Sequence, residues 1–308
     1  MDICSILNDI RSDRRKKVIL DTDAYNEIDD QFAIAWSVLE NGRGIELLSI
    51  NAAPFLNSRS VSPEDGMEKS YDEIQKLLRL IEESGYETGV RPAGIPVYRG
   101  SRGYLPDRKT PLVTDASQNI VKAVLESKET VYIVALGAIT NVASAILMQP
   151  EITENMAVIW LGGNAWHWPN TREFNMVQDV PAAQVIFDSR VPFIQIPCAG
   201  VCDRLATSIP ELSAYLEGKG KLCDYLFSIV KGYTSDPFCW SKVIWDISAV
   251  AVLLARDGLD IVTLPAPILT DDCHYAFDCA RPPMALVRSL DRDTVFRKLF
   301  KILSQGMQ

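Results

Sequence analysis

Short apolar runs alternate along the chain with longer segments in which apolar residues recur at helical spacing. The apolar runs predict strands at residues 18–20, 45–52, 130–136, 157–161 and 191–196. The helical patterns cover residues 28–39, 63–84, 115–127 and 138–148, and a further helix begins at Asp179. Strands that are apolar throughout are buried on both faces, which is typical of a parallel sheet between two layers of helices.

The last third of the chain shows mainly helical patterns, at residues 212–215, 221–231, 241–255 and 292–304. No repeat, low-complexity block or Gly/Ser-rich run marks a domain boundary. We therefore expect a single domain over residues 1–308, a doubly wound α/β fold with a mainly parallel sheet and a helical C-terminal portion. In such folds ligands bind beyond the carboxyl ends of the strands, so polar residues at those positions are the candidates for function.

Composition narrows the classes of function. The 308 residues include 31 Lys and Arg against 40 Asp and Glu, a net charge of −9, which argues against binding nucleic acid through bulk positive charge. The apolar stretch at 247–255 is too short to span a bilayer, and the first residues do not resemble a secretory signal. Seven cysteines, an odd number, favour a reduced chain. We expect a soluble cytoplasmic protein with neither a membrane nor a nucleic-acid partner.

The first strand ends in a concentration of acids. Five carboxylates fall within ten residues, those of Asp21, Asp23, Glu27, Asp29 and Asp30. Like charges in a cleft raise one another's pKa values, and a hard cation would resolve their repulsion. Oxygen ligands without nearby Cys or His favour Ca²⁺ or Mg²⁺ over zinc. Acids in a first helical turn also favour the helix dipole, but helix capping does not account for Asp21 and Asp23.

One interpretation of this segment is that it belongs to the active site of a phosphatase. Asp21-Thr22-Asp23 resembles the strand-end Asp-x-Asp of magnesium-dependent, haloacid-dehalogenase-type phosphatases. That resemblance implies Asp21 as the phosphorylated nucleophile and Asp271 and Asp272 as distant magnesium ligands. The segment departs from that family at Tyr25, where Thr or Val is usual.

The same segment also resembles the Asp-x-Asp-Pro-Gly-x-Asp-Asp that opens the nucleoside hydrolases, the inosine-uridine-preferring N-ribohydrolases. Here the segment is two residues longer and lacks Pro-Gly. Residues 134–141, Val-Ala-Leu-Gly-Ala-Ile-Thr-Asn, are similar to that family's strand-end Thr-Gly-Pro-Leu-Thr-Asn. Glu173-Phe174-Asn175 ahead of Asp179 is similar to its Glu-Phe-Asn-x-x-x-Asp-Pro, and Trp245-Asp246 resembles its His-Asp or Trp-Asp pair. These segments run in the family's order from about residue 18 to 254, as in a divergent member.

The resemblance implies a calcium-dependent hydrolase that acts on the N-glycosidic bond of a ribonucleoside in purine or pyrimidine salvage. Asp23, Asp30, Asp246 and the carbonyl of Leu136 would hold Ca²⁺ together with the ribose hydroxyls and one water. Asp23 would activate that water for attack on the anomeric carbon. The products would be free base and ribose.

The resemblance also implies which residues contact the nucleoside. Asp29, Glu173 and Asn175 would bind sugar hydroxyls. The family's Gly-Asn after the second strand is missing, and Asn57 is the candidate to replace it. Its other ribose-binding amide corresponds to either Asn164 or Asn170.

The base side of the site departs from the family. Trp245 stands where many members place a His that protonates the departing base, so an aromatic-lined pocket around Trp245 is expected, with contributions from Trp166, Trp168 or Trp240. Tyr233 is a further candidate for a base contact. His167 and His274 are the two histidines of the chain, and His167 is the stronger candidate for an acid.

One further interpretation remains open at this point. A chain that lost the acid but kept the metal would be a non-catalytic ribose-binding protein, and Trp245 keeps that alternative open. Members of the family commonly form homo-oligomers, so the resemblance implies a homodimer or homotetramer. Cys198 and Cys202 lack a second cysteine pair at zinc-site spacing and are expected to pack at a strand end.

Overall fold

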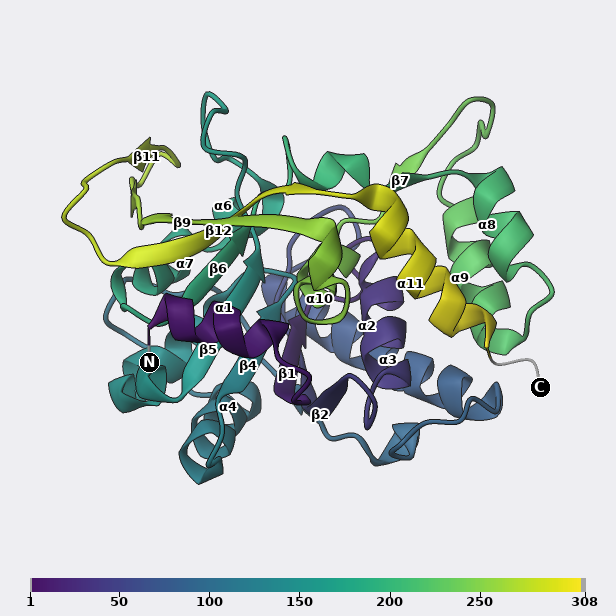
Figure 1. The fold of residues 1–308 in the computed structure, drawn as a ribbon, viewed down its shortest axis with the longest axis horizontal. Helices are drawn as coiled ribbons and strands as arrows, with labels where there is room; N and C mark the ends of the chain where they lie inside the picture. Colours follow the sequence, from purple (N-terminus) through teal and green to yellow (C-terminus); the bar gives the residue numbers. More distant parts are fainter. Residues whose placement is uncertain (1, 306–308) are drawn as a thin grey trace.

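The computed structural model describes residues 2–305, and its centre is an eight-stranded sheet with helices on both faces (Figure 1). The strand order is β3-β2-β1-β4-β5-β6-β12-β9. The sheet is parallel from β3 to β12, and β9 pairs antiparallel with β12 at the edge. In this order the strands are β3 (Val97–Arg99), β2 (Ile45–Ala52), β1 (Lys16–Thr22), β4 (Val131–Ala135), β5 (Met156–Leu161), β6 (Phe193–Ile196), β12 (Pro283–Leu290) and β9 (Leu259–Pro265).

Two hydrophobic cores cover the two faces of this sheet. Alternation along β1 shows the division, because Val18 and Leu20 belong to one core and Ile19 to the other. The first core is covered by α1 (Ile3–Arg11), α2 (Asp30–Leu39), α3 (Pro63–Glu83), α8 (Ile209–Leu216), α9 (Lys221–Lys231), α10 (Ile247–Leu254) and α11 (Arg292–Ser304). The second is covered by α4 (Asp115–Glu126), α5 (Thr140–Met148) and α7 (Val180–Asp188), with the short α6 (Phe174–Gln178) beside them.

The doubly wound α/β class expected from the sequence is confirmed, and so are local details. The hydroxyl of Ser62 accepts from the backbone N–H of Asp65 and caps α3, with Pro63 in the first turn. The side chain of Asp179 likewise caps α7. In residues 2–305, none of the helices combines the length and the apolar character that a membrane crossing requires.

The last third of the chain differs from the sequence prediction. The helix predicted at 241–255 begins only at Ile247, and Lys242–Val243 instead form β8, which pairs with β7 (Ala206–Thr207). The long strands β9 and β12 were not predicted. Their pairing is non-local, since β12 lies between β6 and β9, and Arg288 interrupts its apolar run. The helix α1 was not predicted either, although Asp2 caps it.

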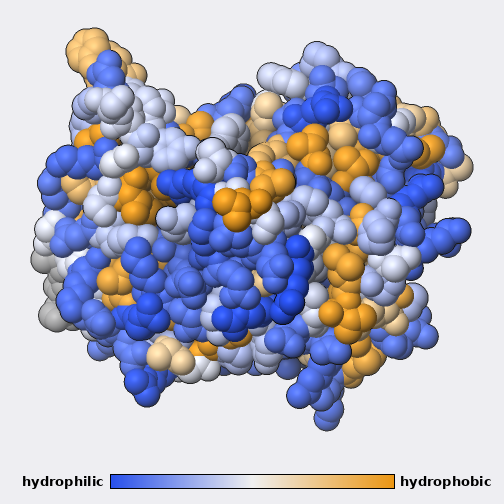
Figure 2. All heavy atoms as spheres, turned by 180° about the vertical axis from the view of Figure 1, so that it is seen from behind, coloured by the Kyte–Doolittle hydropathy of each residue, from blue (hydrophilic) through white to orange (hydrophobic). Residues whose placement is uncertain are grey.

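The surface matches the acidic, charge-rich composition. On the face opposite to that of Figure 1, hydrophilic residues predominate and apolar residues form separate patches (Figure 2). The carboxyl ends of the parallel strands meet at one edge of the sheet, which brings the loops after β1, β2, β4, β5 and β6 together. The site is therefore expected at this edge.

Candidate active site

A cavity of about 510 Å³ lies at the carboxyl edge of the sheet. The loops that follow β1, β2, β4, β5 and β6 line it, together with the segment that precedes α10. This size falls in the range of small-molecule sites in proteins. The walls carry several amide and carboxyl groups in addition to apolar surface, which suits a polar ligand.

Three buried carboxylates converge at the floor of this cavity, which Asp29 and Asp246 line, whereas Asp30 lies beside them without lining it. Oxygen atoms of Asp29, Asp30 and Asp246 all lie within 4.8 Å of one another. Asp30 begins α2, whereas Asp246 precedes α10. The main-chain N–H of Trp245 donates to Asp29 Oδ2 over 3.0 Å and joins two segments that are 216 residues apart in the sequence. The structure thus brings together Asp30 and Asp246, two of the acids that the sequence pattern implied, with Asp29 as the third member of the group.

Asp23 lies beside this group without belonging to it. The charge of Asp23 contributes to the raised pKa of Asp246, and the charges of Asp30 and Asp29 contribute to the raised pKa of Asp23. Gly137 packs directly against Asp23, since a Cβ atom at that position would lie 2.7 Å from Asp23 Cγ. Only glycine therefore leaves the Asp23 carboxylate in its place.

The oxygen atoms of these acids are incompletely satisfied. Asp30 Oδ1 accepts from the hydroxyl of Thr22, but the second oxygen of Asp30 and the Oδ2 of Asp23 are buried and have no hydrogen-bond partner in the part of the chain that the structure describes. Burial without a partner is costly for a carboxylate, so these atoms need a proton or a cation.

Burial and mutual repulsion shift the acids toward their protonated forms. Burial, and then the charge of Asp29, raises the pKa of Asp30 to about 7. Burial and neighbouring carboxylates also raise the pKa values of Asp23 and Asp246 well above their usual range. A divalent cation would reverse these shifts, and a donor set of carboxylate oxygens suits a hard ion such as Ca²⁺ or Mg²⁺. The residues therefore fit the cation that their pattern predicted.

Asp21 has a different environment. Its Oδ2 accepts from the Asn141 amide over 3.0 Å, and the same amide donates to the carbonyl of Ala52. Asn141 Oδ1 accepts from the N–H of Ser101, so this group ties β1, β2 and α5 together beneath the cavity. Burial raises the pKa of Asp21 to about 7. Asp21 does not line the cavity and supports its floor instead.

The wall formed by β5 and α6 holds the predicted sugar contacts. Glu173 accepts from the main-chain N–H groups of Gly163, Asn175 and Met176 at 2.8–3.1 Å. The amide of Asn175 donates to the carbonyl of Leu136 over 2.6 Å and to that of Leu161 over 3.0 Å, and its own Oδ1 is buried without a partner in residues 2–305. The Leu136 carbonyl thus faces the site, where it already accepts one hydrogen bond.

The structure separates the two amide candidates. Asn164 lines the cavity, and its Oδ1 accepts from the N–H of Ala199 over 3.3 Å. Asn170 does not line the cavity and contributes only its main-chain carbonyl, which accepts from Asn164. His167 is exposed on the same loop outside the lining, and His274 is an exposed partner of Asp272. Asn57 does line the cavity and donates to Asn26.

Two of the candidate aromatic residues reach the cavity. Trp245 and Tyr233 line it, and Trp240 packs behind Tyr233 with ring centroids 6.3 Å apart. Trp166 donates instead to Gln195, outside the lining, and Trp168 is exposed on the same loop. The aromatic surface therefore comes from the segment that precedes α10 and from Phe174 at the start of α6.

Sequence reasoning did not assign several other lining residues to the site, and four of them are informative. Asn26 and Glu27 lie in the loop that is two residues longer than the family pattern, so the extra length itself was the available signal. Cys198 follows β6, where the strand-end rule applied to all strands would have found it. Burial raises the pKa of the Cys198 thiol well above its usual value. The sequence around Arg59 contains no motif that would have identified it as a lining residue.

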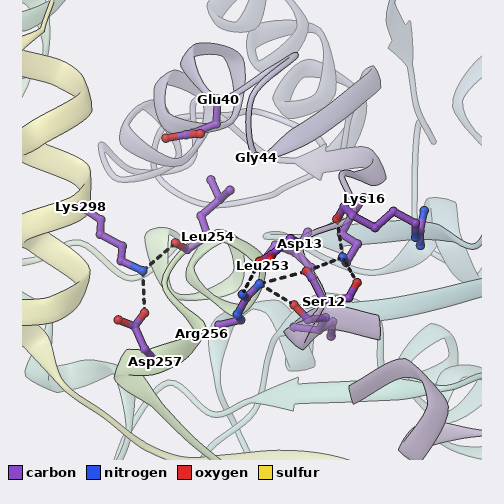
Figure 3. Close-up of a pocket in the computed structure, with 12 residues that line it drawn as sticks. Ser12, Asp13, Lys16, Glu40, Gly44, Leu253, Leu254, Arg256, Asp257 and Lys298 are labelled. Carbon is purple, nitrogen blue, oxygen red and sulfur yellow. Dashed lines mark hydrogen bonds and ion pairs between the residues drawn. The ribbon is translucent and has the colours of Figure 1, made fainter. Parts of the chain in front are cut away.

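A second cavity, of about 480 Å³, lies at the opposite edge of the sheet (Figure 3). It is bounded by the start of β1, the end of α10 and α11. Lys298 donates to the carbonyl of Leu254 and to Asp257, and Lys16 donates to Ser12. The cations that line this cavity are thus already paired within the chain.

Comparison with known proteins agrees with this geometry. The model of the inosine-uridine preferring nucleoside hydrolase family matches residues 18–296. The chain belongs to this family. Nucleoside hydrolases are metal-dependent, in keeping with the three converging carboxylates.

Individual nucleoside hydrolases resemble this one over part or all of its length. The pyrimidine-specific ribonucleoside hydrolase RihB of Escherichia coli strain K12 / DH10B is 31% identical over 124 residues, which are 39% of this chain and 39% of that protein. The aligned part thus spans about two fifths of that relative. The solved plant nucleoside hydrolase PpNRh1 has a TM-score of 0.73 at 19% identity and covers 95% of this chain and 100% of its own. The purine-preferring ribonucleoside hydrolase from Gardnerella vaginalis has a TM-score of 0.73 at 18% identity, covering 94% and 99%.

Membership in this family overturns the phosphatase interpretation. Asp271 accepts from Gln184 of α7, and Asp272 pairs with His274 in the small hairpin β10 (Ile268–Leu269) and β11 (Tyr275–Ala276). Neither of these acids lines the cavity. The acidic segment after β1 therefore has no phosphatase partner at 271–272.

Proposed function

We propose that this chain is a calcium-dependent enzyme that hydrolyses the N-glycosidic bond of a ribonucleoside and releases base and ribose. The observation that carries the proposal is the convergence of Asp29, Asp30 and Asp246 at the floor of the cavity, next to oxygen atoms of Asp23 and Asp30 that have no partner in the described residues. Acids held so close, with raised pKa values, are costly to the fold unless a cation joins them.

Asp23, Asp30, Asp246 and the carbonyl of Leu136 are the proposed ligands of the cation, and Asp29 is close enough to join them. When bound, such an ion orients sugar hydroxyls and lowers the pKa of a coordinated water. Ca²⁺ accepts six to eight oxygen ligands, more than the chain supplies here, which leaves room for water and sugar.

Asp23 is the proposed general base. Its Oδ2 is buried and unpartnered within residues 2–305, so it is available to accept a proton as water attacks the anomeric carbon. Glu173, Asn175, Asn164 and Asp29 would hold the sugar. Because Glu173 is itself fixed by three main-chain donors, it would hold the sugar in one orientation, and orientation of this kind contributes strongly to rate.

The base would lie against Trp245 and Tyr233, which line the same cavity. Aromatic stacking contributes about 0.5–1.5 kcal/mol beyond area burial, too little by itself to expel a poor leaving group. The hydroxyl of Tyr233, which donates to Glu27, is a candidate proton donor in the lining, and Asn57 would supply an amide.

The decisive experiment is a panel of purine and pyrimidine nucleosides assayed for free base with Ca²⁺ and with chelator. We expect release with Ca²⁺ and its loss on chelation. Asp23→Asn should lower turnover by about 10²–10⁴-fold while the fold persists, because the general base is lost. Asp271→Asn, remote from the cavity, is the matched control. Tight nucleoside binding without base release would favour the ribose-binding alternative.

We also propose that residues 1–308 form a single domain and that the enzyme is a homodimer or homotetramer. The continuous sheet from β3 to β9 supports the first point, since it draws strands from the whole length between residues 16 and 290. The second point rests on the family alone and is testable by light scattering. A monomer at micromolar concentration would refute it.

A further inference from the structure

The loop after β1, with its two extra residues, places a carboxylate at the rim of the cavity. Glu27 lines the cavity, and its side chain is 32% exposed. One carboxylate oxygen is ion-paired with Lys242 Nζ, and the other accepts from the Tyr233 hydroxyl over 2.9 Å. The main-chain carbonyl of Glu27 accepts from Arg59 Nη1 over 2.7 Å. Glu27 thus joins three loops that come from distant parts of the chain.

Lys242 is a buried cation whose charge acts on Asp29 of the acid cluster. Its side chain is only 8% exposed, and it precedes Asp246 on the same segment. Burial alone would lower the pKa of Lys242, but the charges of Asp29 and Glu27 raise it. Burial raises the pKa of Asp29, and the charge of Lys242 opposes that rise. Lys242 is therefore attracted by two carboxylates, one at the rim and one at the floor.

These two carboxylates compete for one ammonium group. An ammonium paired with Asp29 would neutralise one of the three acids that converge at the floor, and it would repel a divalent ion from the same place. Paired with Glu27, the ammonium remains at the rim. Its position there is also supported by the Tyr233 ring, whose centroid lies 5.3 Å from Lys242 Nζ.

We propose that Glu27 is a positioning residue that retains Lys242 at the rim and so keeps Asp29, Asp30 and Asp246 free to bind a divalent cation. The proposal rests on the proposed function only in taking the floor of the cavity as a cation site. The proposal also assigns a role to the two extra residues of the loop, since the shorter family pattern has no position that corresponds to Glu27. Arg59 supports the arrangement by fixing the carbonyl of Glu27.

The test is calorimetric titration of Ca²⁺ into chelator-treated full-length protein, for wild type, Glu27→Gln, Lys242→Met and the double variant. Glu27→Gln should weaken Ca²⁺ binding by about tenfold, because the released ammonium then competes at Asp29. Lys242→Met should bind Ca²⁺ at least as tightly as wild type. The double variant should return to near wild-type affinity, a rescue that a merely structural role of Glu27 would not produce.

Asp9→Asn is the matched control, because Asp9 also pairs with a cation, Arg14, and accepts from a tyrosine hydroxyl, that of Tyr132, and none of these residues lines the cavity. Its Ca²⁺ affinity should equal that of wild type. Unchanged affinity in Glu27→Gln, or lost affinity in Lys242→Met, overturns the positioning role. The Lys242→Met result decides the matter even where Glu27→Gln fails to fold. Wild-type protein that binds no Ca²⁺ would instead overturn the proposed function itself.

Discussion

Two cavities of this protein lie at opposite edges of the same sheet and have similar volumes, about 510 and 480 Å³. They differ in how their charges are satisfied. At the amino edge, Lys298, Arg256 and Lys16 all donate to carbonyl or carboxylate oxygens of the chain (Figure 3). At the carboxyl edge, Asp23 and Asp30 keep oxygen atoms without partners in the described residues.

This difference separates a structural site from a functional one. Charges paired within the chain stabilise the junction between α1, α10 and α11 and need nothing from outside. Carboxylates gathered with too few counter-charges weaken the fold, and such an arrangement is expected where an external group completes the site. Size and polarity alone would not have distinguished the two cavities.

The largest expected effect comes from removing an acid at the functional edge. Asp246→Asn should weaken Ca²⁺ binding by roughly 100-fold or more, because it deletes a charged oxygen ligand where even supporting partners contribute 10–100-fold. Base release at limiting Ca²⁺ should fall with it. Titration calorimetry and a free-base assay measure the two effects. If Asp246→Asn bound Ca²⁺ as tightly as the wild type, the proposed difference between the two cavities would be wrong.

A smaller effect is expected from displacing Asp23 without changing its charge. Gly137→Ala would place a methyl group 2.7 Å from Asp23 Cγ, so the carboxylate must move. Misplacement of a reacting group by about 1 Å costs on the order of 100-fold in rate. Steady-state kinetics should show a fall in kcat, whereas Gly103→Ala, which meets nothing within 4 Å, should leave kcat unchanged.

The pH dependence of stability should also differ between the edges. Burial raises the pKa values of Asp21 and Asp30 to about 7, above the ordinary value of 3.8. A raised pKa in the folded state gives stability that is complete at low pH and lost as pH rises through about 7. The Tm of chelated protein should therefore fall as the pH rises from about 4 to about 7, and Ca²⁺ should raise it most at pH 8. Asp30→Asn should flatten the fall; an equally steep profile would contradict this assignment.

The smallest effect is expected at the amino edge. Lys298 and Asp257 are 40% and 64% exposed, and exposed ion pairs contribute about 0–1 kcal/mol. Lys298→Met should therefore change the free energy of unfolding by no more than this and leave base release unaltered. Urea unfolding and the nucleoside assay test the two points. Loss of activity would show that the paired cavity also serves function.

The sequence predicted the strand-end acids because they are local in the chain. Asp23, Asp29 and Asp30 follow one apolar strand, and Glu173 and Asn175 belong to one short motif. Arg59 and Glu27 could not be recognised in this way, because their contacts with each other and with Tyr233 join loops that only the folded chain brings together. Strands β9 and β12 were missed for the same reason, since each is defined by its neighbours in the sheet.

The single hydrogen bond from the Trp245 N–H to Asp29 has a consequence for biosynthesis. The acids after β1 emerge early from the ribosome, whereas Asp246 arrives only when α10 has been made and has docked against α2. For most of its synthesis, the nascent chain therefore contains only some of the carboxylates of this group. If the floor binds Ca²⁺ as proposed, capture of the ion would mark the moment at which both ends of the fold are joined.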